Sequence, residues 1–165
     1  GVPCAAYGLS AAIAERIYSD PDYCNADGGG IGGTLAGNAL SLAAMRATLG
    51  EVLTDAAFER MIELGEYFER GLRDVIASRG LPWHVVRLGC RVEYLFRREV
   101  AKNGREAAAG QDDELDPFIH LYMLNRGVLI TPFHNMALMS PATTIADVDR
   151  HTELFGSAAD ELTGR

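Results

Sequence analysis

The chain has 165 residues, 48% of them hydrophobic, and can bury a core in one or two compact units. Its formal net charge of −8 argues against nucleic acid as the main partner, because phosphate binding needs clustered lysine and arginine. No apolar run reaches the roughly 18 residues of a membrane span and no signal-peptide pattern opens the chain, so we expect no membrane contact. The three scattered cysteines and four histidines lack zinc-ligand spacing, which predicts no metal site and a reduced, cytoplasmic setting.

The first third of the chain predicts short apolar elements around a glycine-rich segment. Residues 1–8 suit a short buried strand or its exit loop, and a short helix is expected over 10–17 with Ser10 as its N-cap. The turn-rich and glycine-rich stretch 19–33 is expected to form a loop. The apolar pattern over 38–49 then predicts a second helix.

From about residue 55 the predicted order is helix, strand, strand, helix, strand, helix, which describes a small α+β unit. Apolar residues at helical spacing predict a long first helix, and Arg79-Gly80-Leu81-Pro82 ends it. The elements are expected as a helix over 55–79, strands over 83–88 and 91–96 around a Gly89-Cys90 turn, a loop over 97–111, a helix over 112–124, a strand over 128–130, an irregular segment over 132–141, and a helix from Thr144.

Five glycines occupy the six positions 28–33. A loop with so little side chain exposes its backbone N–H groups, and a hydroxyl beside a helix start can hold an anion. The pattern Gly-x-Gly-x-x-Gly formally fits the dinucleotide fingerprint, but that motif needs a hydrophobic strand immediately before it, and residues 19–27 are turn-rich instead. A Walker A loop needs Gly-Lys-Ser/Thr, and no lysine is nearby. We therefore expect neither nucleotide site, and a flexible connector remains the alternative for these glycines.

The residues that follow the glycines resemble a family signature. The run Gly33-Thr34-Leu35-Ala36-Gly37-Asn38-Ala39-Leu40, with Ala43-Ala44, is similar to the Gly-Thr-(Leu/Phe)-(Ser/Ala)-Gly-Asn-Pro-(Leu/Val)-x-x-Ala-Ala signature of class III, fold type I, pyridoxal-phosphate aminotransferases. Residues 123–128 and 139–148 resemble two later patterns of that family, and residues 1–9 resemble the segment after its catalytic lysine. The similarity covers nearly the whole chain and points to the branch that contains glutamate-1-semialdehyde aminomutase.

This resemblance implies a fold with α/β and α+β parts, namely the end of a fold type I, PLP-binding large domain over 1–53 and a small C-terminal α+β domain over 54–165. The lysine that binds the cofactor is then expected just upstream of Gly1, so the chain would be a C-terminal fragment with no catalytic residue of its own. The single lysine of the sequence, Lys102, lies in a polar stretch and is no substitute. We also expect residues 1–47 to be poorly packed in isolation, and a homodimer formed through the large domain.

The resemblance further implies which residues bind pyridoxal 5'-phosphate and substrate. Thr34 matches the family threonine whose hydroxyl and N–H bind the cofactor phosphate across the dimer interface, and Gly33 is expected to let the backbone approach it. An ordinary helix-start threonine is the alternative for Thr34. His134 lies in the loop expected to face the active site. Arg126 is the nearest candidate for a substrate carboxylate, and an arginine favoured by the dipole at a helix C-terminus is its alternative.

The activity implied is amino-group transfer between an amino acid, with β-amino acids among the candidates, and a keto acid. Glutamate-1-semialdehyde 2,1-aminomutase activity is the alternative, but that branch typically carries Pro-Ser-x-Phe-Glu where this sequence has Pro132-Phe133-His134-Asn135. A non-catalytic dimerisation or binding module that kept the fold is a third hypothesis.

Overall fold

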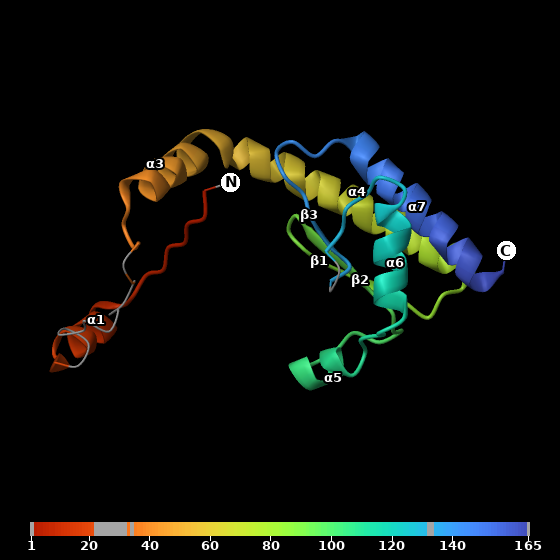
Figure 1. Ribbon diagram of the computed structural model, residues 1–165, viewed down its shortest axis with the longest axis horizontal. Coiled ribbons are helices and arrows are strands. Elements are labelled where there is room, and N and C mark those ends of the chain that lie inside the picture. Colours follow the sequence, from red (N-terminus) through yellow and green to blue (C-terminus); the bar gives the residue numbers. More distant parts are fainter. Residues whose placement is uncertain (1, 22–32, 34, 132–133, 165) are drawn as a thin grey trace. The chain divides into compact units, whose positions relative to one another are not determined.

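The fold is described from a computed structural model over residues 2–21, 33, 35–131 and 134–164 (Figure 1). The chain forms two compact units, Gly1–Thr54 and Asp55–Arg165. Within the described residues, every helix is too short or too polar to cross a lipid bilayer.

The described residues of the first unit form short helices, the first two of which begin at side-chain caps while the π-helical turn has none. They are α1 (Ala11–Tyr18), α3 (Ala39–Ala47) and a π-helical turn η1 (Thr48–Val52). The hydroxyl of Ser10 accepts from the backbone N–H of Ile13, as predicted for this N-cap, and the side chain of Asn38 accepts from the backbone N–H of Ser41. Residues 2–9 are extended without strand pairing, which agrees with the exit-loop alternative. No described residue of this unit is buried, so its helices have local caps and little core to stabilise them.

The second unit is an antiparallel sheet packed against helices, in the order β1-β2-β3. Register pairs Val86 with Glu93 between β1 and β2, and Glu93 with Met136 between β2 and β3. Gly89 opens the β1–β2 turn with a φ of 57°, as two-residue hairpins of the II′ type require. The elements are α4 (Asp55–Arg79), β1 (His84–Leu88), β2 (Arg91–Leu95), α5 (Gly104–Ala108), α6 (Leu115–Leu124), β3 (Met136–Leu138) and α7 (Ile145–Thr163).

The core of this unit lies between one face of the sheet and the helices. Helices α4 and α7 run side by side, and α4 also contacts β1 and β2 (Figure 1). Alternation along the strands directs Val85, Val92 and Tyr94 to the buried face. Helix α4 buries one stripe at helical spacing, and α7 begins with a complete capping box between Thr144 and Asp147. The largest fully buried side chains are Phe68, Leu72, Val92, Ile119, Met123 and Phe155.

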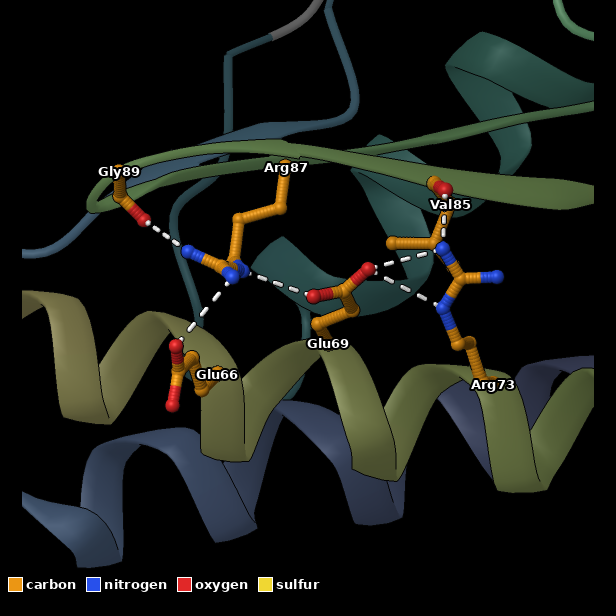
Figure 2. Close-up of polar contacts among 6 residues, drawn as sticks. All are labelled: Glu66, Glu69, Arg73, Val85, Arg87 and Gly89. Atoms are coloured by element: carbon orange, nitrogen blue, oxygen red, sulfur yellow. Dashed lines mark hydrogen bonds and ion pairs between the residues drawn. The ribbon is translucent and has the colours of Figure 1, made fainter.

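An arginine–glutamate cluster joins α4 to the first hairpin (Figure 2). Arg87 points from β1 to α4, where its Nε donates to Glu69 at 2.8 Å and its Nη2 lies 3.3 Å from Glu66. Glu69 also accepts from Arg73, whose Nη2 donates to the carbonyl of Val85 at 2.9 Å. Burial alone would raise the pKa of Glu69, but the hydrogen bonds from the two arginines outweigh it and hold that pKa below its usual value. The cluster therefore fixes the position of the hairpin on α4.

Gly65 sits where α4 passes directly beneath the hairpin turn. A Cβ at this position would lie 3.1 Å from the carbonyl oxygen of Gly89 and 3.4 Å from Cα of Cys90. We therefore expect Gly65→Val to lower the free energy of unfolding by about 1–3 kcal/mol, because backbone atoms on both sides must move apart. Chemical denaturation measures this loss, and Ala77→Val on the exposed side of α4 is the matched control. Helix propensity alone would make Gly65→Val neutral or slightly stabilising and Ala77→Val slightly destabilising, so a loss in Gly65→Val no larger than that in Ala77→Val would show that the close approach does not constrain position 65.

Three expectations for the second half of the chain are wrong. The predicted strand over 128–130 has no ladder partner among the described residues, and the third strand is instead β3, inside the segment expected to be irregular. The segment 97–111 contains α5, which the side chain of Asn103 caps by accepting from Glu106 N. The long helix, the first hairpin and the last two helices were correctly predicted to within a few residues.

Candidate functional site

The glycine turn before α3 presents backbone at a helix start. Gly33 and Gly37 have φ values of 67° and 66°, and a Cβ at either position would meet no atom within 4 Å. The N–H of Ala36 donates to the carbonyl of Gly33 at 3.2 Å, which closes the turn. An open turn that leads into a helix N-terminus has the geometry and partial positive charge that favour an anion. Thr34, the residue predicted to bind the cofactor phosphate, lies outside the described residues, so its role stays a prediction.

His134 lies beside a charged pair on β2. Its Nδ1 is 3.3 Å from the carboxylate of Glu93, and the other oxygen of that carboxylate accepts from Arg91 Nη2 at 2.5 Å. Arg91 and Glu93 alternate with Val92, so they lie on the sheet face opposite the buried one. The side chain of Glu93 is only 14% exposed, so its contacts with Arg91 and His134 replace most of its water.

A second polar pair lies next to this one. Asn135 is buried, and its side-chain amide donates to the carboxylate of Asp116 at 2.6 Å, while its carbonyl accepts from Tyr94 N at 3.2 Å. The two pairs line one cavity of about 390 Å³, whose far wall is α5 and the residues after it. Convergent charged and amide groups of this kind can orient a small polar molecule by hydrogen bonds.

Arg126 is held at the end of α6, and the cavity that His134 lines does not include it. Its guanidinium carbon lies 3.5 Å from the centre of the Tyr122 ring, its Nη1 donates to the carbonyl of Tyr122 at 3.3 Å, and its Nη2 is 3.6 Å from Glu161. Stacking on an aromatic face and capping of helix carbonyls are common structural uses of arginine. The structure thus does not bring the two predicted substrate-binding residues together, and a substrate role for Arg126 stays a prediction.

Sequence reasoning did not select Arg91, Glu93, Asp116 or Asn135. The sequence could have indicated one of these pairs, because alternation along β2 places Arg91 and Glu93 on the same face of the sheet. Their proximity to His134 depends on the pairing of β2 with β3, which joins positions more than 40 residues apart.

Comparison with known proteins identifies relatives over almost the whole chain. No protein-family model matches it. Glutamate-1-semialdehyde 2,1-aminomutase of Thermus thermophilus is 32% identical over 160 residues, which cover 96% of this chain and 36% of that protein. A glutamate-1-semialdehyde aminomutase from Pseudomonas aeruginosa, solved in complex with PMP, is 48% identical with a TM-score of 0.85, over 94% of this chain and 35% of that one.

The chain is homologous to part of the glutamate-1-semialdehyde aminomutases. The predicted resemblance to class III aminotransferases is therefore confirmed, and so is the fold type I class that it implied. A β-phenylalanine aminotransferase from Variovorax paradoxus shares the fold with a TM-score of 0.77, at 23% identity. The chain spans about a third of the length of these aminomutase relatives.

Homology to the aminomutases implies the cofactor pyridoxal 5'-phosphate. The residues present fit only the phosphate end of this cofactor. Gly33 and Gly37 are exposed and precede α3, a position that suits a phosphate group. The sequence has one lysine, Lys102, which belongs to the second compact unit and whose backbone N–H donates to Glu106 at 2.8 Å. A phosphate site at this turn stays a prediction, and so does the expectation that Lys102 is not the lysine that binds the cofactor.

Proposed function

We propose that the chain is part of a pyridoxal 5'-phosphate-dependent enzyme that transfers an amino group between an amino acid and a keto acid. The single observation that carries this proposal is the 48% identity with the Pseudomonas aeruginosa aminomutase over 94% of the chain. When bound, the cofactor supplies an electron sink for the substrate carbon that loses a proton. In this proposal residues 1–53 complete a large cofactor-binding domain, residues 54–165 form the small domain, and two copies pair through the large domain in the cytoplasm.

In this proposal Gly33 and Thr34 hold the cofactor phosphate. Gly33 is exposed and has a left-handed backbone, and a threonine hydroxyl can donate a hydrogen bond to a dianion. The lysine that holds the other end of the cofactor is supplied by residues outside this chain.

The Arg91–Glu93 pair and His134 orient the substrate in this proposal. The guanidinium offers donors to a carboxylate, and Glu93 fixes the direction in which those donors point. A substrate with a carboxylate near the transferred amino group suits this arrangement, and β-amino acids remain among the candidates.

Aminomutase activity is the second candidate, because the curated relatives at 30% identity or more include glutamate-1-semialdehyde 2,1-aminomutases from several bacteria. The two activities differ in whether an added keto acid is needed as acceptor. Turnover that requires the keto acid favours transamination, and turnover without it favours intramolecular transfer. A module that kept the fold without catalysis is the third candidate.

The test begins with the coding DNA upstream of Gly1. A lysine codon within a few positions, after codons for an apolar strand, would support the proposal, and the longer protein should then absorb visible light when loaded with cofactor. Replacement of that lysine should remove this absorption. Another residue in its place, or absorption that persists without it, would contradict the proposal.

Thr34→Val in the longer protein is expected to weaken cofactor binding about tenfold to a hundredfold, the usual loss for one hydrogen bond to a charged group. The spectroscopic titration of apoenzyme with pyridoxal 5'-phosphate measures this change. Thr34→Ser keeps the hydroxyl and is the matched control, so it should bind nearly as tightly as the parent. Equal affinity in all three proteins would assign Thr34 an ordinary structural role at the helix start.

A further inference from the structure

A mostly apolar pocket of about 370 Å³ opens between α4, α7 and the β3 region of the second unit. Its wall combines Phe68 of α4, the extended segment 128–131, the strand β3 and the start of α7. The proposed transfer reaction uses none of these residues. A pocket of this size falls in the range of small-molecule sites, and an apolar cavity of about 150 Å³ is already enough to bind benzene.

The polar side chains of the pocket are Thr131, Thr143, Asp147 and His151, and three of them have internal partners. The hydroxyl of Thr131 donates to the carbonyl of His134, and that of Thr143 accepts from Ser140 N at 2.9 Å. The carboxylate of Asp147 accepts from the backbone and the hydroxyl of Thr144 at 2.8 and 2.7 Å. These three groups thus have little capacity left for a ligand.

His151 differs from the other three. It is 6% exposed, and its Nδ1 is buried with no hydrogen-bond partner in the part of the chain that the structure describes. The ring of Phe68 meets the imidazole edge-on with 4.8 Å between centroids, and Tyr94 and Phe155 lie on its other sides. Burial lowers the pKa of His151 to about 4, so the ring is neutral at physiological pH. A buried polar group without a partner carries a cost that a ligand could remove.

The charge of the pocket restricts the ligand. The hydroxyl and the backbone N–H of Thr144 both donate to the carboxylate of Asp147 and hold its pKa below the usual value, so this carboxylate is ionised. No arginine or lysine is among the described residues that line the pocket. An anionic ligand would therefore meet repulsion from Asp147 without compensation, and a cationic one would have to lose its water against mostly apolar walls.

We propose that this pocket binds a small uncharged aromatic molecule that carries one hydroxyl group, with its ring among Phe68, Val148 and the β3 residues and its hydroxyl donating to the imidazole of His151. A neutral imidazole has one nitrogen that accepts, and rotation about its terminal torsion exchanges the two nitrogens between the pocket and the interior. The ligand thus supplies the hydrogen bond that the described part of the chain does not give His151.

Phenol is the probe, titrated into the 165-residue chain while the methyl signals of Met136, Met139 and Val148 are followed by NMR. We expect saturable shifts of these signals. Toluene, which has the ring without the hydroxyl, should bind about fivefold to tenfold more weakly, as expected for the loss of one hydrogen bond. Benzoate should bind more weakly than phenol because of Asp147.

Two variants test the site itself. His151→Phe keeps an aromatic ring and removes both nitrogens, so phenol and toluene should then bind equally. His120→Phe is the matched control, since His120 Nδ1 is also buried without a partner in the described structure but lies outside the pocket. Ala137→Met should fill the pocket and weaken both ligands. On the parent chain, the proposal is overturned if phenol causes no saturable shift, if phenol binds no better than toluene, or if benzoate binds more tightly than phenol. It is also overturned if His120→Phe changes the affinity for phenol as much as His151→Phe does.

Discussion

Phe155→Ala is expected to lower the free energy of unfolding of the second unit by about 3–5 kcal/mol, the range for truncating a fully buried aromatic side chain. Phe155 is completely buried on α7. Its ring lies 4.6 Å from that of Tyr94 and 5.8 Å from that of Trp83, measured between centroids. The variant loses the ring contacts that Phe155 makes with Tyr94 and Trp83 and leaves a cavity that rigid neighbours fill only in part.

Urea denaturation followed by tryptophan fluorescence measures this loss. Trp83 is the single tryptophan of the sequence and belongs to the second unit, so its signal reports unfolding of that unit. Phe58→Ala on α4 is the matched control, because Phe58 is 43% exposed and should cost about 1 kcal/mol or less. Similar losses in the two variants would show that Phe155 is not buried against Tyr94 and Trp83.

Helix starts were the most predictable features, because the cap is a local interaction. Ser10, Asn38 and Thr144 each stand a few residues before the backbone N–H that they accept from, and the apolar pattern after them was visible in the sequence. Residues within one turn of each other determine this geometry, so it does not depend on the rest of the fold.

The third strand was misplaced because strand pairing is not local. Val128-Leu129-Ile130 has the β-branched, apolar composition of a strand, yet Leu129 is 78% exposed and the register of β2 selects Met136 to Leu138 instead. Helix α5 was missed because its five residues are too few to show a helical period, and only the cap at Asn103 marks it.

The candidate site was predictable only in part for the same reason. His134 was selected from its place in a family pattern, but its contact with Glu93 arises from the pairing of β2 with β3. The phosphate anchor at Gly33 and Thr34 was inferred from a contiguous motif, which sequence can display in full. Alternation along one predicted strand already places Arg91 and Glu93 on the same face, but their proximity to a distant loop depends on the fold.

The stability of the second unit is expected to fall by about 3 kcal/mol as the pH decreases from 6.5 to 4, because of His151 alone. Burial among aromatic rings lowers the pKa of His151 to about 4 in the folded chain, against 6.5 when the side chain is in water. Above pH 6.5 the imidazole is neutral in both states and makes no pH-dependent contribution to stability. Between pH 6.5 and 4 the unfolded chain binds a proton that the folded chain does not, so unfolding becomes more favourable. Below pH 4 both states are protonated and the loss levels off.

The His151→Phe variant isolates this contribution from that of the carboxylates, which titrate in both proteins. Denaturation at pH 7 and at pH 4 should show a smaller loss in the variant than in the parent, by about 3 kcal/mol. His134→Gln is the control, since the His134 side chain is 47% exposed, and it should keep the full loss of the parent. If His151→Phe loses as much stability on acidification as the parent does, water reaches the imidazole and the aromatic enclosure around it is not closed. A smaller loss in the variant alone would show that the same enclosure that keeps His151 neutral also makes the second unit sensitive to acid.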